Sequence, residues 1–84
     1  MSELLSHVPA AEAPLMAWPA VCGAAVAGRA RAASFACGVL RVEVPDATWR
    51  VQLIELEPRY VRELARVLGR SDVQRVEFFI KGKP

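Results

Sequence analysis

The chain has 84 residues, which is enough for a single domain with one hydrophobic core. Hydrophobic residues make up 54% of it, but no apolar run approaches the roughly 20 residues of a membrane span. The formal net charge of +2 neither requires nor excludes a nucleic-acid partner. The N-terminal residues lack the positive start and long apolar stretch of a signal peptide, so we expect a cytoplasmic protein.

Groups suited to catalysis or metal binding are sparse. Two cysteines, Cys22 and Cys37, are too few for a disulfide framework or a zinc site, and the single histidine, His7, precedes the first helical pattern. Glu55 and Glu57 are the one candidate pair of acid–base carboxylates, but charges beside a helix break are usually only solvated. With no P-loop or dinucleotide-binding glycine pattern either, we expect no enzyme, no cofactor and no metal.

The first predicted element is a helix that begins at Pro14, a residue suited to a first-turn position. Apolar residues then recur at helical spacing. Pro19 should kink this helix or restart it with Trp18 near the cap. We expect the helix to end around residues 29–31.

A β-hairpin follows, and it is the clearest local signal. Short apolar segments lie on both sides of the pair Cys37-Gly38, and a two-residue loop with glycine second is typical of a type I′ turn. In that register Ala36 pairs with Val39. The inner face then carries Phe35, Leu40, Val42 and Val44, and the outer face carries Arg41 and Glu43.

A second helical stretch and a last strand complete the chain. Asp46 is suited to cap the helix, Pro58 to kink or divide it, and Gly69 to end it. The strand is expected over residues 73–80. The order α-β-β-α-β predicts an α+β fold, a three-stranded sheet with helices on one face and water on the other. We divide the chain into an arm over residues 1–13, a core over 14–80 and a short basic tail over 81–84.

Arginines form a stripe on the second helical stretch. They follow steps of three, four and four residues: Arg59, Arg62, Arg66 and Arg70. One interpretation is contact with phosphate or an acidic partner. The simpler one is a solvated face on which Glu63 pairs with Arg59 and Arg66. Arg29 and Arg31 are the second candidate group, although helix-dipole stabilisation also explains positive residues after a helix.

Three aromatic residues need placing. Trp18 and Trp49 are expected to anchor the core. Phe79 is predicted on the outer sheet face, where packing against the N-terminal arm is the preferred interpretation. The alternative is a partner-binding patch or a platform for base stacking.

Four segments carry a family resemblance through their order and spacing. They are Trp18-Pro19-Ala20-Val21-Cys22-Gly23, Gly38-Val39-Leu40-Arg41-Val42-Glu43-Val44, the helix start with Trp49 and Leu53, and Val73-Gln74-Arg75-Val76-Glu77-Phe78. Together they resemble the DciA family of bacterial replication proteins, in which a tryptophan precedes a Val-Gly pair and a glycine leads a strand. The resemblance covers most of the chain. Its signature residues are expected to build the fold: Trp18, Gly23, Gly38, Leu40, Val42, Trp49 and Leu53.

The resemblance implies a fold similar to the K-homology domain and a non-enzymatic adaptor in replication initiation. It implies binding to the DnaB-type replicative helicase and, in some members, to single-stranded or double-stranded DNA. We expect no membrane partner and no small-molecule substrate. Many members carry a long basic extension, whereas this sequence ends at Pro84. Two alternatives stay open: a stand-alone DNA- or RNA-binding module, although there is no Gly-x-x-Gly loop, and a truncated paralogue with a structural role.

Overall fold

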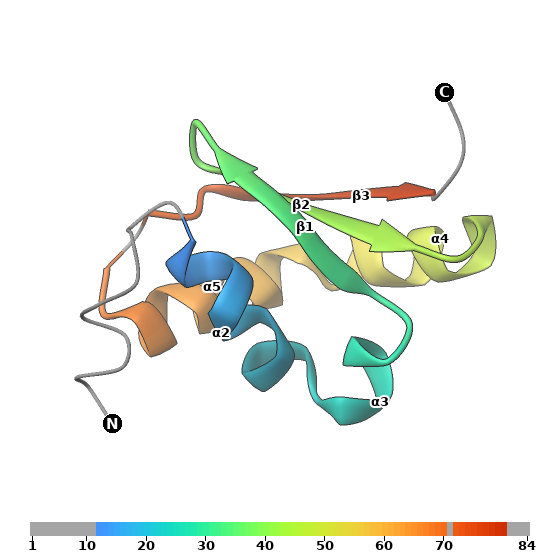
Figure 1. Cartoon of the computed structure of the whole chain (residues 1–84), viewed down its shortest axis with the longest axis horizontal. Coiled ribbons are helices and arrows are strands. Elements are labelled where there is room, and N and C mark those ends of the chain that lie inside the picture. Colours follow the sequence, from blue (N-terminus) through green and yellow to red (C-terminus); the bar gives the residue numbers. More distant parts are fainter. Residues whose placement is uncertain (1–11, 71, 81–84) are drawn as a thin grey trace.

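The computed structural model describes residues 12–70 and 72–80, so residues 1–11 of the predicted arm and the predicted tail lie outside it. In chain order the elements are α2 (Ala13–Cys22), α3 (Ala24–Ala27), β1 (Arg31–Ala36), β2 (Val39–Val44), α4 (Ala47–Glu55), α5 (Glu57–Leu68) and β3 (Arg75–Ile80) (Figure 1). This order confirms the predicted α+β class.

The three strands form one mixed sheet in the order β1-β2-β3. β2 runs antiparallel to β1, as a tight hairpin requires, and parallel to β3, because α4 and α5 carry the chain back before β3 begins. The described helices lie on one side of the sheet (Figure 1). This arrangement confirms the predicted three-stranded sheet covered by helices on one face.

The hairpin has the predicted register and turn. Ala36 lies opposite Val39, as predicted. Phe35 lies opposite Leu40, which places both on the predicted inner face. Cys37 and Gly38 have φ angles of 53° and 79°, and positive φ at both central residues defines a type I′ turn. Glycine adopts such a φ without steric cost, whereas Cys37 does so under strain.

Local signals also fix the second helical stretch. The Asp46 carboxylate accepts a hydrogen bond from the backbone N–H of Trp49 at 2.9 Å, which is an N-cap. The stretch divides at Leu56, because Pro58 is suited to the first turn of a new helix rather than to a helix interior. Gly69 ends α5 in the left-handed conformation.

The predicted end of the first helix is wrong. α2 continues through Pro19 and stops at Gly23, whose φ of 87° is open to glycine but costly for other residues. The chain then makes only the single turn of α3. β1 begins at Arg31, within the segment predicted to end the helix, and a bulge between Ala32 and Ser34 accommodates its first residues.

The core lies between the sheet and the helices. Its centre is an aromatic cluster in which the Trp18 ring meets the edge of Tyr60 at 4.9 Å between centroids, with Phe78 at 6.2 Å from Trp18. The indole N–H of Trp18 donates to the carbonyl of Ala30 at 3.0 Å, so its polar group is satisfied inside the core. The buried apolar residues are Ala17, Trp18, Ala30, Leu40, Val42, Val44, Leu53, Tyr60, Leu64, Val73, Val76 and Phe78.

Candidate partner-binding surface

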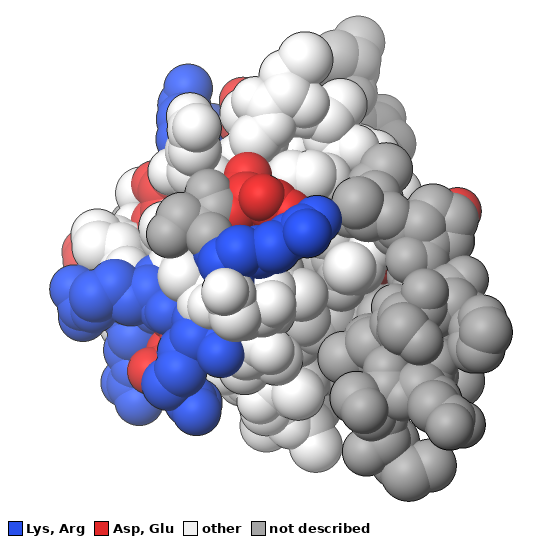
Figure 2. Space-filling view, turned by 90° about the vertical axis from the view of Figure 1, so that its left-hand side faces the viewer, with Lys and Arg blue, Asp and Glu red and all other residues white. Residues whose placement is uncertain are grey.

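α5 presents three arginines of the predicted stripe on its outer face, whereas Arg70 lies beyond the end of the helix, after Gly69. Tyr60 and Leu64 anchor the opposite face in the core. All four arginines are exposed: Arg59, Arg62, Arg66 and Arg70. Viewed from the end of the molecule where α5 finishes, arginine side chains gather on one side with a small area of acidic atoms among them (Figure 2).

Two of these arginines are paired with carboxylates. Arg66 donates to Glu63 at 2.6 Å through Nη2, and Arg70 donates to Asp72. The hydrogen bond from Arg66 and then its charge, with smaller contributions from Arg59 and Arg62, hold the pKa of Glu63 below its ordinary value. Arg59, Arg62 and Arg66 therefore lie close enough to Glu63 for their charges to act on the same carboxylate. The four arginines of the stripe are called the arginine patch below.

The other two arginines, Arg59 and Arg62, form no ion pair within the described residues. The predicted pairing of Glu63 with Arg66 is therefore confirmed, and the predicted pairing with Arg59 is not formed. Four arginines against two carboxylates leave the patch with a net positive charge of two. Exposed ion pairs contribute little to stability, so an acidic partner or phosphate can displace the carboxylates at small cost.

Arg29 and Arg31 form a separate group. They line a hollow of about 140 Å³ together with Glu43, Val44 and Pro45. Arg31 lies in β1 opposite Glu43, so it is not a residue at a helix end. The end of α3, which precedes this group, lies away from the end of α5 (Figure 1). The two predicted basic groups do not form one surface.

Phe79 lies on the outer face of the sheet, as predicted, and is half-buried. The guanidinium of Arg41 lies over its ring, 4.6 Å from the centroid, and Arg41 also pairs with Glu77 at 3.0 Å. Arg41 therefore covers one ring face, which reduces its use as a stacking platform. Packing of Phe79 against the N-terminal arm concerns residues outside the described part.

The signature residues lie in the core or at turns. Trp18, Leu40, Val42 and Leu53 are buried, and Trp49 is half-buried against the core. Gly23 and Gly38 both have positive φ. None of these residues belongs to the arginine patch.

The sequence analysis missed an apolar face on α4. Val51 and Ile54 are 58% and 42% exposed, while Trp49 and Leu53 of the same helix turn inward. A shallow, open hollow beside Val51 is lined by Ala47, Thr48, Val51 and Gln52. The sequence did contain a signal for this face. The apolar residues of α4 point to several sides of the helix, so they cannot all pack against one core.

Chemistry-bearing groups are not clustered in the described part. The Glu57 carboxylate accepts a hydrogen bond from the backbone N–H of Val76 at 3.0 Å, so it is structural rather than half of an acid–base pair with Glu55. Across residues 12–70 and 72–80, no three His, Cys, Asp or Glu side chains come together as metal ligands. No helix in the same ranges is long and apolar enough to cross a membrane.

These features define a small α+β domain with a basic helical surface and an apolar helical face. The family described as Dna[CI] antecedent, DciA, matches residues 2–78, and the chain belongs to the DciA family. Membership in this family supports a general role in replication, related to helicase loading. The comparison with curated proteins gives no match.

Proposed function

We propose that this chain is a non-enzymatic adaptor that binds a DnaB-type replicative helicase in the cytoplasm during replication initiation. The proposed contact is the arginine patch of α5, with Arg59 and Arg62 as its principal residues. Arg29 and Arg31 are second candidates, and Phe79 is a weaker one because Arg41 covers its ring.

The observation that carries this proposal is that Arg59 and Arg62 form no ion pair within the described residues. Both lie on α5, a helix that packs against the core. Tyr60 and Leu64 fix the inner face of α5, so the outer arginines are presented without reorganisation of the backbone. Preorganised charge gains affinity because less conformational freedom is lost on binding. The exposed Val51 and Ile54 of α4 supply the apolar area that a protein interface also needs.

DNA is the second proposed partner of the same patch, because guanidinium groups bind phosphate as well as carboxylate. The parallel pairing of β2 with β3 after two helices supports a K-homology-like arrangement. RNA bound in the K-homology manner is less well supported. The junction of α4 and α5 at Leu56 has no glycine and is flanked by Glu55 and Glu57, whose negative charge opposes phosphate.

A titration of the purified chain against the replicative helicase of its own organism tests this proposal. Single-stranded and double-stranded DNA are titrated in parallel at two salt concentrations. Helicase binding that persists without DNA supports the adaptor. Salt-sensitive DNA binding alone supports the stand-alone nucleic-acid module. Absence of binding in all titrations contradicts both and supports a structural role.

A further inference from the structure

The edge strands β1 and β3 differ in whether side chains hydrogen-bond to their outward-facing backbone N–H and C=O groups. On β3, Glu57 accepts from the N–H of Val76 at 3.0 Å, and Nε of Arg50 donates to the carbonyl of Phe78 at 2.9 Å. An edge strand otherwise presents such groups to any incoming strand. Two side chains therefore close the β3 edge.

The β1 edge has no such side chains within the described residues. The nearest side-chain hydrogen bond, from Trp18, ends on Ala30 just before the strand. The turn makes Ala36 and Val39 a hydrogen-bonded pair, and the next pair along an antiparallel ladder directs its backbone groups outward. The N–H and C=O of Phe35 therefore point away from β2, and within residues 12–70 and 72–80 no other segment hydrogen-bonds to them.

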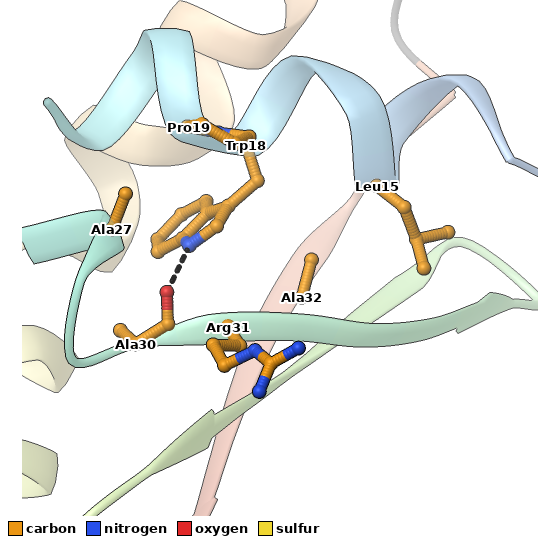
Figure 3. Close-up of a pocket in the computed structure, with 7 residues that line it drawn as sticks. All are labelled: Leu15, Trp18, Pro19, Ala27, Ala30, Arg31 and Ala32. Atoms are coloured by element: carbon orange, nitrogen blue, oxygen red, sulfur yellow. Dashed lines mark hydrogen bonds between the residues drawn. The ribbon is translucent and has the colours of Figure 1, made fainter. Parts of the chain in front are cut away.

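A hollow of about 230 Å³, the Trp18 hollow, lies between α2 and the beginning of β1; most of its lining residues are apolar, and Arg31 adds a polar side chain (Figure 3). The indole of Trp18 forms its inner wall, and the remaining lining comes from Leu15, Pro19, Ala27, Ala30, Arg31 and Ala32. This position lets a side chain enter from a strand that lies alongside β1. A hollow of this size beside an open strand edge is a feature of peptide recognition by strand addition.

The neighbouring hollow, defined above by Arg29 and Arg31, supplies charge at the same end of β1. Arg31 and Glu43 are register partners and share the sheet face opposite to Ala32. Consecutive side chains of an extended peptide point to opposite faces. A strand added before the bulge, alongside Arg31 and Ala32, would place one side chain at the Trp18 hollow and the next beside Arg29 and Arg31.

We propose that β1 binds an extended segment of a protein partner as a fourth strand, with an apolar side chain adjacent to an acidic one. Two arginines against Glu43 leave this end of the edge positive, and β1 itself has no acidic residue. A second copy of the chain is a poorer occupant, because it brings Arg29 and Arg31 again. This inference does not depend on the arginine patch of α5.

A synthetic peptide that alternates valine and glutamate, with one central leucine, is the probe for this site. The control peptide carries lysine at each glutamate position. We expect saturable binding of the glutamate peptide, weakened about tenfold by Arg31→Glu, since loss and reversal of one contact is worth about 1.4 kcal/mol. Arg75→Glu is the matched charge reversal at an exposed residue of β3, outside both basic groups, and should leave this affinity unchanged.

Nuclear magnetic resonance locates the peptide. We expect shifts in the amide signals of β1 and in the indole N–H signal of Trp18, which is assigned with the Trp49→Phe variant. Ala32→Leu adds bulk to the Trp18 hollow and should weaken peptide binding. Circular dichroism should show that this variant is still folded. Equal binding of the lysine peptide, no binding of the glutamate peptide, or shifts confined to α5 would overturn the proposal.

Discussion

The indole N–H of Trp18 donates a hydrogen bond of 3.0 Å to the carbonyl of Ala30, twelve residues later in the chain. Trp18 belongs to α2, and Ala30 immediately precedes β1. Both residues are buried, at 1% and 0% exposure. This contact fixes the helix against the sheet at the point where the chain enters its first strand.

Trp18 is expected to be the residue whose loss most destabilises the fold. Trp18→Ala removes a buried aromatic side chain and should lower the free energy of unfolding by about 3–5 kcal/mol. Trp18→Phe keeps a ring but leaves the carbonyl of Ala30 unpaired, at a cost of about 1–3 kcal/mol. Denaturant unfolding measures both. A Trp18→Phe protein as stable as the parent would show that the hydrogen bond contributes nothing.

Asp46 is predicted to stabilise α4 through its N-cap alone. Asp46→Ala removes the acceptor for the N–H of Trp49 and should cost about 1 kcal/mol. Asp46→Asn keeps a side-chain oxygen and serves as the control, with stability close to that of the parent. Thermal or denaturant unfolding of the three proteins checks this. Equal losses in both variants would assign the effect to charge rather than to capping.

Tyr60 provides a test of core burial, because it is the only tyrosine in the chain. Burial, and secondarily the charge of Cys22, raises the pKa of its hydroxyl above the ordinary 10.0. We expect the phenolate absorbance to titrate at higher pH in the native protein than in concentrated denaturant. The neutral form is favoured by folding, so this stability is present below the unfolded pKa and is lost as pH rises through the folded one. Identical titrations in the two states would contradict the burial of Tyr60.

The two cysteines should react at different rates. Burial raises the pKa of the Cys22 thiol above its ordinary 9.0, against a smaller opposing effect of its hydrogen bond to the backbone. Cys37 is exposed at the hairpin turn. Iodoacetamide at mildly alkaline pH should therefore alkylate Cys37 first, as measured by mass spectrometry. The Cys37→Ser variant should react slowly, and rapid labelling of that variant would show that Cys22 is accessible.

Much of the fold could be predicted because its signals are local. The pair Cys37-Gly38 sets the hairpin register, and Asp46 and Pro58 mark where helices begin. The first helix is predicted to end at residues 29–31 because its apolar residues keep helical spacing beyond Gly23, whereas α2 runs through Pro19 and ends before Gly23. Whether a helix continues through a proline depends on tertiary packing, which the local sequence pattern does not reveal.

The site could be predicted less completely. The spacing of the α5 arginines gave the stripe, but which of them are paired depends on side-chain geometry. The closed edge of β3 was not predictable, because Arg50 reaches Phe78 across 28 residues and Glu57 reaches Val76 across 19. Contacts between side chain and backbone at such separations have no periodic signature in a sequence.

The affinity of a charge-reversed α5 for the replicative helicase tests the central claim most directly. In the double variant Arg59→Glu, Arg62→Glu, we expect binding to weaken about a hundredfold, since each reversed contact is worth about 1.4 kcal/mol. Arg75→Glu makes the same kind of charge change at an exposed residue of β3, outside the patch, and should bind nearly as the parent does. Parental affinity in a folded double variant would contradict the assignment of the α5 arginine patch as the helicase contact.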